Sequence, residues 1–364
     1  GKHWGIRPLR RELPGLLGLT DESVARSAIP PREGNWAKAE LPVPTEDFPP
    51  EELPYATLLD SYGSSGNVTA DLDAIVAEYR IPEPYTDEDE AKADGLKPVS
   101  VKRLDCTSDT VVTIDPVDAR DYDDALSISK SPAKGQVVVG VHIADVASYI
   151  RPNSEFDLKA RERCFTSYLP GRTLPMLPKK LADVSRLLRH RRMTRERFLP
   201  MAMPEIRVVC SEKPSQILGV QQSEDNPSHQ LVEEFMLAAN ECVARELQRL
   251  GLPGLYRNHA APDQEKLMDF AAAATLMTGE RVKGLGTRGA IVRFLKHAAE
   301  SPLRDVLYMT FLRHLPRADY GAECQGHYGL GKEFYCHFTS PIRRYADLLV
   351  HQQLLSHDLR RKPY

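Results

Sequence analysis

The most regular pattern of apolar and polar positions is helical and lies near the middle of the chain. Between residues 228 and 250, apolar side chains recur every three or four positions, and a Gly-Leu-Pro sequence follows. This period places the apolar side chains on one helix face, and glycine followed by proline ends the helix. The apolar positions are Leu231, Val232, Phe235, Met236, Ala239, Val243 and Leu247. We expect this face to belong to a protein core.

Shorter patterns predict further helices and a set of strands. Helices are expected at 70–79, 155–164, 263–278 and 303–315, with a short one within 13–24. Apolar, β-branched runs predict strands at 111–114, 125–130 and 136–146, the last two forming a hairpin. Residues 165–171 break these patterns and are expected to form a loop. The mixture predicts an α+β or mixed α/β fold.

Residues 1–98 are expected to form a short, irregular N-terminal region, followed by a main domain at 99–364. Proline and charge dominate the first half of this region, as in F-P-P-E-E at 48–52. The acidic residues 87–90 indicate either a solvated linker or a helix start. The region therefore either packs on the main domain or is the remainder of a larger module.

The composition is typical of a globular protein. The 364 residues are 41% hydrophobic and 27% charged, with a net charge of -3. That net charge argues against uniform attraction to nucleic acid, so any basic surface must be local. Six cysteines without zinc-like spacing indicate reduced, buried thiols. We find neither an apolar signal core nor an apolar stretch of membrane-spanning length, so we expect a cytoplasmic protein.

An acidic segment between two predicted strands gives the strongest chemical signal. Five carboxylates fall within ten residues, namely Asp115, Asp118, Asp121, Asp123 and Asp124. Carboxylates held close together repel one another unless a cation compensates them. Hard oxygen ligands of this kind suit Mg²⁺ or Mn²⁺, which are usually shared with substrate phosphates. The alternative is an acidic turn on a solvated surface.

Two basic segments could attract phosphate groups. Residues 179–197 contain eight lysines and arginines, including Arg191 and Arg192, against two acidic residues. The alternative for this segment is a solvated helix face. The sequence K-G-L-G-T-R-G at 283–289 lacks the spacing of a nucleotide-binding loop. It is therefore only a weak signal for phosphate binding by backbone amides.

The sequence F-T-S-P-I-R-R-Y-A-D near the end of the chain predicts an anion-binding helix start. The helix is expected to begin at its Ser-Pro pair, with Thr339 or Ser340 as the cap. Arg343 and Arg344 would then lie in the first turn, where positive charge is unfavourable unless a phosphate lies nearby. The alternative is that both arginines pair with local acids such as Asp347.

Together these motifs resemble the ribonuclease II (RNB) family of 3′-to-5′ exoribonucleases. The resemblance covers roughly residues 102–355, in the family's order. Its blocks are T-I-D-P-V-D-A-R-D-Y-D-D-A-L at 113–126, V-H-I-A-D-V at 141–146, Y-L-P-G…L-P-M-L-P at 168–178, L-V-E-E-F-M-L-A-A-N-E at 231–241, H-Y-G-L-G at 327–331 and F-T-S-P-I-R-R-Y-A-D. The first and last blocks are long and specific. The resemblance implies an RNB catalytic domain, in which helices surround a twisted mixed sheet.

The resemblance also implies a role for each matching residue. The family's four catalytic, metal-binding aspartates match Asp115, Asp121, Asp123 and Asp124. Asp118 matches none of them. Arg343 matches the arginine that contacts the phosphate near the scissile bond, and Tyr168 matches the aromatic that stacks on the 3′-terminal nucleotide. Further RNA contacts are expected from Arg344, Ser340, Arg191 and Arg192.

The chain departs from the family pattern in three places. Segment 256–263, where well-known members have a second stacking aromatic, contains alanines, so stacking there is one-sided or supplied from elsewhere. The stretch after the L-P-M-L-P block is much shorter. The oligonucleotide-binding barrel that usually follows the last block is absent, and the N-terminal cold-shock barrels are at best vestigial. This pattern indicates either a naturally reduced protein or a fragment of a longer one. If the chain is complete, fewer RNA-tracking grooves predict lower processivity than in a full-length relative.

The resemblance implies a monomeric enzyme that takes the 3′ end of single-stranded RNA into a channel and releases nucleoside 5′-monophosphates. Two Mg²⁺ ions, or Mn²⁺, about 4 Å apart would activate water and stabilise charge on the phosphate. No membrane partner is expected. Two alternatives stay open. One is a non-catalytic RNA-binding or regulatory protein that keeps the fold. The other is a metal-dependent phosphodiesterase acting on short oligonucleotides or single-stranded DNA.

Overall fold

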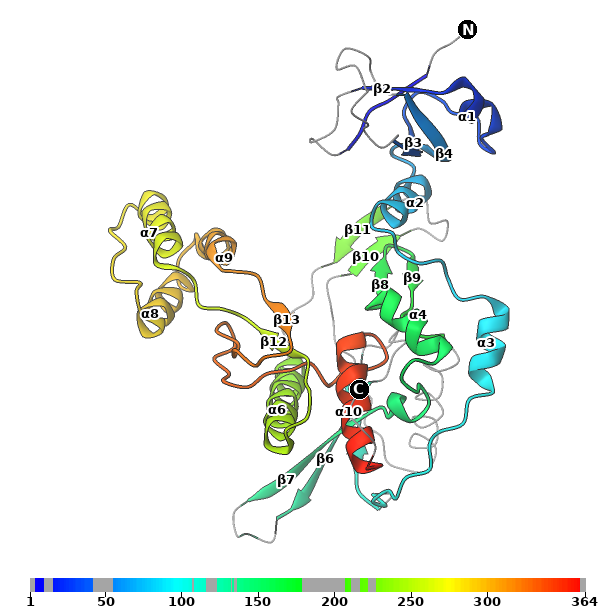
Figure 1. Ribbon diagram of the computed structural model, residues 1–364. Coiled ribbons are helices and arrows are strands. Elements are labelled where there is room, and N and C mark those ends of the chain that lie inside the picture. Colours follow the sequence, from blue (N-terminus) through cyan, green and yellow to red (C-terminus); the bar gives the residue numbers. More distant parts are fainter. Residues whose placement is uncertain are drawn as a thin grey trace.

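The fold is a mixture of helices and small β-sheets, as predicted. A computed structural model describes residues 4–9, 16–41, 55–106, 108–115, 123–131, 133, 136–178, 207–210, 217–221 and 227–360. Figure 1 shows an N-terminal sheet, a central body around helix α10 (Tyr345–Asp358) and a group of three helices on one side.

The N-terminal sheet contains its own small core. Its elements are β1 (Gly5–Ile6), β2 (Leu17–Leu19), α1 (Asp21–Arg26), β3 (Asn35–Glu40) and β4 (Tyr55–Ser64). The strand order is β1-β2-β4-β3, with β2 and β4 parallel. The short helix expected within 13–24 is therefore wrong in its position. Leu17 and Leu19 are both buried and alternate with Gly18, which is a strand pattern, and the helix begins only afterwards.

Two capped helices follow this sheet. In α2 (Val68–Glu78), Asn67 Oδ1 accepts hydrogen bonds from the backbone amides of the first turn, which confirms the helix expected at 70–79. The acidic run begins α3 (Asp87–Asp94), where Thr86 and Asp89 form a capping box. Ala93 of α3 packs into the core of the central body. The boundary near residue 98 stays a prediction.

The elements of the central body are β5 (Val111–Val112), β6 (Asp124–Lys130), β7 (Val137–Ile143), a 3₁₀ turn (Val146–Ser148), α4 (Glu155–Arg163), β8 (Ser167–Leu169), β9 (Arg172–Leu174), β10 (Arg207–Cys210), β11 (Ile217–Gln221), α6 (Pro227–Leu250), β12 (Tyr256–Asn258), β13 (Asp319–Gly321) and α10. Strands β5, β6 and β7 form an antiparallel sheet, which confirms the hairpin. The loop expected at 165–171 is instead the hairpin β8–β9, because Gly171 adopts a left-handed φ of 70° in its turn.

The core of the central body surrounds α10. Leu348 and Val350 of this helix are fully buried, and they belong to two clusters that include Ile150 and Leu247. Leu247 lies at the C-terminal end of α6, whereas Leu231 at the other end is 48% exposed. Only part of the predicted apolar face of α6 is therefore core.

Three helices form a side unit with a separate core. They are α7 (Gln264–Thr278), α8 (Arg288–Ala298) and α9 (Arg304–His314), packed around residues such as Phe270 and Phe311 (Figure 1). Helices α7 and α9 were expected from the sequence, but α8 was not. Among the described residues, no helix combines the length and the apolar character that a membrane span requires. Cys164 and Cys242 are exposed, so the expectation of buried thiols is wrong for them.

Candidate active site

The first part of the site is a pair of carboxylates brought together by strand register. Val112 of β5 pairs with Leu126 of β6, so the residues that follow β5 approach those at the start of β6. This register places Asp115 beside Asp124, which pairs with Ile143 as the first residue of β6. The predicted clustering of these two acids is therefore present in the fold.

The two acids destabilise one another as charged groups. Burial, followed by the charge of Asp115, raises the pKa of Asp124 to about 6, while Arg343 opposes the shift. A carboxyl group in this position gains from a nearby cation more than an exposed one would. Hard, crowded oxygen donors suit a divalent cation such as Mg²⁺ or Mn²⁺. Asp115 and Asp124 thus fit one edge of a metal site.

Asp123 joins the acidic segment to the distant arginine motif. Its side chain is buried, and Oδ1 accepts a 3.0 Å hydrogen bond from the backbone amide of Ile342. The other oxygen, Oδ2, lies 3.4 Å from Nε of Arg343. Its carbonyl accepts from the amide of Ala144 at 2.8 Å, which fixes the backbone at the start of β6. Asp123 therefore holds Arg343 next to Asp124.

The arginine motif forms a turn that precedes its helix, and we name residues 340–344 the arginine turn. The expectation that the helix starts at Ser340 is wrong, and so is the expectation that Thr339 or Ser340 caps it. Helix α10 begins at Tyr345, with Arg344 in an extended conformation as its N-cap and no side-chain cap. The carbonyl of Ser340 accepts from the amides of both arginines, which closes the turn. Asp347 stabilises this geometry by accepting a 2.8 Å bond from the Ser340 amide.

The two arginines have different surroundings. Arg344 donates to Asp347 at 2.8 Å, so the alternative of local pairing holds for this residue. Arg343 is 48% exposed and donates to Ser340 Oγ at 3.1 Å, in addition to its contact with Asp123. Ser340 is buried beneath it. Arg343 is therefore held from behind while its guanidinium remains accessible, as phosphate binding requires.

Tyr168 projects from a hairpin that is bonded to the arginine turn. The amide of Thr166 donates to the carbonyl of Arg343 at 2.9 Å, and the amide of Tyr345 donates to the carbonyl of Cys164 at 2.8 Å. These two backbone hydrogen bonds hold segment 164–166 next to segment 343–345. Tyr168 follows in β8 with 58% of its surface exposed. Only Ser167 separates it from Thr166, which is bonded to Arg343.

Two buried polar residues support the site and were not predicted. Asn240 of α6 donates to Tyr335 Oη at 3.2 Å and accepts from the amide of Phe338 at 2.9 Å, which secures the segment leading to the arginine turn. Asp157 of α4 accepts from Tyr345 Oη at 3.0 Å. Asn240 lies within the L-V-E-E-F-M-L-A-A-N-E block, where a polar residue inside an apolar face is a usable signal. Asp157 has no such signal.

Some predicted site residues cannot be placed. Asp118, Asp121, Arg191 and Arg192 lie outside the described residues. Within the described ranges, no group of three or more His, Cys, Asp or Glu side chains is arranged to hold a metal ion. The described residues alone therefore do not form a complete metal site. One predicted ligand, Asp121, lies outside the described residues.

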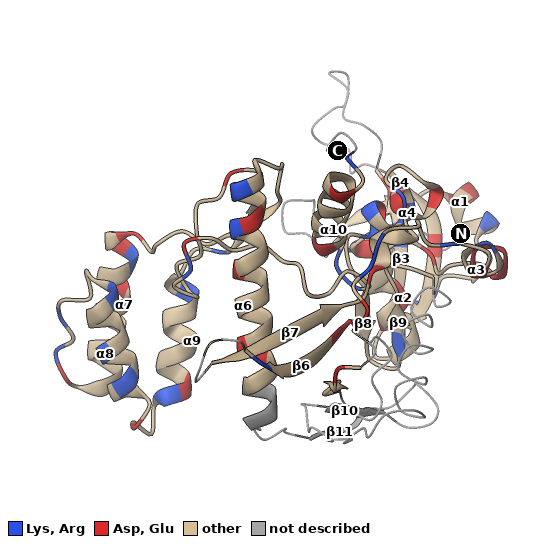
Figure 2. Ribbon diagram, turned by 90° about the horizontal axis from the view of Figure 1, so that it is seen from below, with Lys and Arg blue, Asp and Glu red and all other residues tan. Residues whose placement is uncertain are grey.

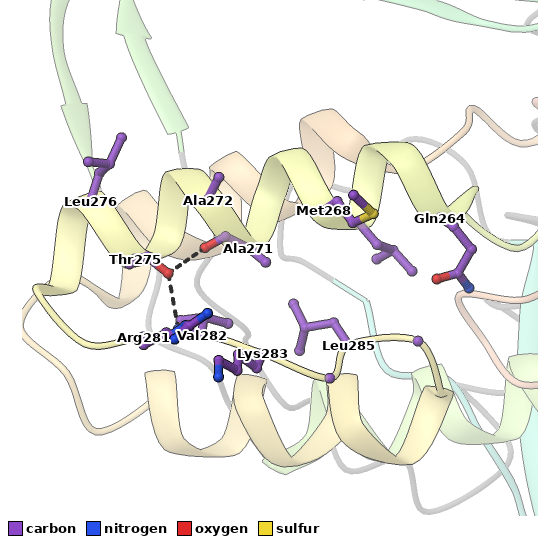
Figure 3. Close-up of a pocket in the computed structure, with 13 residues that line it drawn as sticks. Gln264, Met268, Ala271, Ala272, Thr275, Leu276, Arg281, Val282, Lys283 and Leu285 are labelled. Atoms are coloured by element: carbon purple, nitrogen blue, oxygen red, sulfur yellow. Dashed lines mark hydrogen bonds between the residues drawn. The ribbon is translucent and has the colours of Figure 1, made fainter.

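Two cavities of the described part of the chain lie away from these acids, since neither is lined by Asp115 or Asp124. They have volumes of about 650 and 760 Å³ and border the glycine-rich loop between α7 and α8. Figure 3 shows the first, with Thr275 of α7 anchoring the loop through a 3.0 Å bond from the Val282 amide. Arg281 and Lys283 line both cavities. The glycine-rich loop thus belongs to the three-helix unit.

The charge distribution over the ribbon is mixed. Figure 2 shows basic and acidic residues interspersed along α6, which agrees with the small net charge of -3. Local geometry, not overall charge, must therefore define where a polyanion binds.

Comparisons with known proteins identify the family of the chain. A family profile described as the RNB domain matches residues 103–185 and 179–357. Ribonuclease R of Chlamydia trachomatis is 31% identical over 399 residues, covering 90% of this chain and 57% of that protein. Ribonuclease R of Escherichia coli is 28% identical over 360 residues, covering 78% of this chain and 44% of that protein. The chain thus spans about half the length of these relatives.

Solved structures show the same fold. The apo form of Mycoplasma genitalium RNase R has a TM-score of 0.76 at 20% identity, covering 98% of this chain and 68% of that one. Yeast Ssd1, described as a pseudonuclease, has a TM-score of 0.69 at 16% identity, covering 100% of this chain and 54% of that one. The profile covers more than half of the chain, and the acids and the arginine turn lie inside it. The chain belongs to the RNB domain family.

Proposed function

We propose that this chain is the nuclease portion of a 3′-to-5′ exoribonuclease, which hydrolyses single-stranded RNA to nucleoside 5′-monophosphates with two divalent cations. One observation carries the proposal: the crowded pair Asp115 and Asp124 lies beside Arg343, which Asp123 holds in place. The Ribonuclease R relatives support it. So do the structures of Mycoplasma genitalium RNase R with ribose-methylated single-stranded RNA and with double-stranded RNA.

Each described residue has a defined task in this proposal. Asp115 and Asp124 would hold Mg²⁺ or Mn²⁺, with Asp121 completing the ligand set. The bound ions supply an activated water and neutralise charge on the phosphate. Asp123 orients the guanidinium of Arg343, which donates to the phosphate as charge builds on it. Tyr168 positions the terminal base by stacking, which is tolerant of sequence because every base offers a π-face.

Other aspects of the proposal follow from the sequence. Single-stranded RNA entering by its 3′ end is the expected partner, and we propose a monomer. A cytoplasmic location remains a prediction from composition.

Hydrolysis of a 5′-labelled oligoribonucleotide tests the function directly. Chelated protein should be inactive, and added Mg²⁺ or Mn²⁺ should restore the stepwise release of mononucleotides from the 3′ end. Replacing Asp124 by Asn should abolish the release of mononucleotides, because the substitution removes a ligand of the cation. RNA binding should persist, because the substitution removes no contact with the RNA. Arg343→Gln should lower kcat at least about a hundredfold.

Asp94→Asn is the matched control, since Asp94 is an exposed acid on α3. This variant should hydrolyse RNA at the parent rate. The proposal fails if no metal supports mononucleotide release, or if Asp124→Asn retains it.

A second candidate is a non-catalytic RNA-binding protein that keeps the fold. The likeness to yeast Ssd1 over the whole chain favours this candidate, because Ssd1 has the same fold and is described as a pseudonuclease. Binding of RNA without metal-dependent cleavage would select this candidate. A phosphodiesterase acting on DNA or short oligonucleotides would instead show itself in the same assay, by cleaving single-stranded DNA or very short RNA preferentially.

A further inference from the structure

A tyrosine stacked on an arginine lies at the surface of the small sheet β12–β13. Arg257 of β12 and Tyr320 of β13 are paired across the two antiparallel strands. The guanidinium carbon of Arg257 lies 4.6 Å from the centre of the Tyr320 ring. Tyr320 is nevertheless 43% exposed, so much of its surface is open to solvent. An exposed aromatic backed by a cation is a suitable surface for a planar, electron-rich ligand.

A hydrogen bond fixes the orientation of this ring. Tyr320 Oη and His337 Nδ1 are 2.7 Å apart, and the two rings meet edge to face at 5.6 Å. Burial lowers the pKa of His337 to about 3, so its imidazole is neutral at physiological pH, and its Nδ1 shares one hydrogen bond with the tyrosine hydroxyl in either tautomer. A ring held in one orientation loses little entropy when a ligand stacks on it.

The position of Tyr320 relates it to the arginine turn. Tyr320 is hydrogen-bonded to His337, which lies three residues before the arginine turn. Arg344 also contributes to lowering the pKa of His337 and opposes the rise in the pKa of Tyr320. The hairpin bearing Tyr168 is bonded to Arg343 through Thr166. Two exposed tyrosines, Tyr168 and Tyr320, therefore lie on segments that are connected to the arginine turn.

A second arginine–tyrosine pair shows what a purely structural arrangement looks like. The guanidinium of Arg288 lies 5.0 Å from the ring of Tyr328. The same guanidinium also donates to the carbonyls of Tyr328 and Gly329, so it braces a loop. Among the described residues, the Arg257 guanidinium makes no comparable hydrogen bond. Its stacking on Tyr320 is thus not explained by a bracing role.

We propose that Tyr320, backed by Arg257, is a stacking platform for one nucleobase of the RNA strand, in addition to Tyr168. The platform rests on the proposed function, because it needs RNA to pass the arginine turn. Its ligand is an unstacked base of a single strand, bound through its π-face without preference for sequence. The positive charge of Arg257 strengthens the contact and attracts the adjoining phosphate.

Abasic scanning in an inactive background tests the platform. The parent protein is Asp124→Asn, and the probes are oligoribonucleotides that each lack one base at successive positions from the 3′ end. Binding is measured by fluorescence anisotropy. The parent should bind one of these probes more weakly than intact RNA, because that probe lacks the base that stacks on Tyr320. With Tyr320→Ala added, intact RNA should bind about 5- to 50-fold more weakly, and loss of the base at that position should have no further effect.

Two further variants separate stacking from folding. Tyr320→Phe keeps the ring and should retain most of the affinity. Tyr328→Ala removes the other arginine-backed tyrosine and should leave the response at each position unchanged.

The platform is overturned if Tyr320→Ala binds every probe with the affinity of the parent, or if the parent binds no RNA. It is also overturned if Tyr320→Ala lowers the affinity for all abasic probes by the same factor. Failure of the proposed function gives a different result. The wild-type chain would then bind RNA with the expected response to missing bases but release no mononucleotides.

Discussion

Asp124 shows how one half-buried carboxyl group links the stability of the fold to its chemistry. Its pKa is raised to about 6 by burial and by Asp115. The folded protein therefore prefers this group protonated, although a metal-binding role needs it charged. Without a cation, the charged form must lower the stability of the fold at neutral pH.

We expect Asp124→Asn to stabilise the chelated protein at pH 7. The unfolded carboxyl group titrates near 3.8 and the folded one near 6, so stability falls as pH rises through this window. Asparagine resembles the protonated form and removes this loss, which amounts to about 1–3 kcal/mol. Urea unfolding between pH 4 and 7 measures the difference, which should vanish near pH 4.

Adding Mg²⁺ should make the wild-type protein more stable than Asp124→Asn at pH 7. Only the wild-type protein has the Asp124 carboxylate to bind the ion, and binding to the folded state stabilises it. Asp94→Asn should unfold like the wild type at every pH. A difference between wild type and Asp124→Asn that stays constant from pH 4 to 7 would contradict the assigned cause.

At the scale of single residues, the sequence predicts the acids better than their partners. The high density of aspartates at 115–124 and the strands on both sides are sufficient to predict that Asp115 and Asp124 lie close together in the fold. The bond from Asp123 to Ile342 spans 219 residues, and no local pattern encodes it. The role of Asp157 was missed for the same reason, since its partner Tyr345 is 188 residues away.

At the scale of elements, the arginine turn depends on its junction with α4 and β8. Tyr345 Oη donates to the buried Asp157 and accepts from Arg161 Nε at 3.1 Å. The same residue begins α10 directly after Arg344. A side chain on α4 therefore fixes the start of the helix that follows the arginines.

We expect Tyr345→Phe to lower the free energy of unfolding by about 1–2 kcal/mol, because a buried carboxylate loses a hydrogen bond. It should also reduce RNA hydrolysis, as the arginine turn loses its support. Equilibrium unfolding and kcat are measured on the same protein. Tyr308→Phe is the control, since Tyr308 donates to the carbonyl of Leu295 within the three-helix unit. Its hydrolysis should be unchanged; equal losses of kcat in both variants would contradict this role for Tyr345.

Elements with a strong repeat were predicted and those set by single residues were not. The long α6 and the hairpin β6–β7 follow from periodicity. The β8–β9 hairpin was missed because its strands are short and its turn depends on the φ of Gly171. Helix α8 was missed because the glycine-rich segment runs directly into its cap, Thr287.

At the scale of the whole molecule, α3 connects the N-terminal sheet with the central body. Tyr85 donates to the carbonyl of Met176 at 2.7 Å, and Ala93 and Leu96 pack into the core around α10. The segment before residue 98 thus contributes to the core of the domain that follows it.

A fragment comprising 99–364 should therefore be less stable than one comprising 81–364. The shorter fragment exposes the apolar surface that Tyr85, Ala93 and Leu96 cover, a loss of several kcal/mol at roughly 25 cal/mol per Å². Thermal unfolding of the two fragments, followed by circular dichroism, measures the difference. Equal midpoints would show that α3 is dispensable and would favour the boundary near 98.

The separation of 219 positions between Asp123 and Ile342 also determines when a new chain can hold Arg343 in place. At roughly 5–20 residues per second, translation leaves about 10–45 s between the two. During that interval the aspartates have been synthesised and their guanidinium partner has not. If the proposed function holds, a nascent chain that still lacks residues 340–344 cannot position the arginine, so RNA cleavage would await their synthesis.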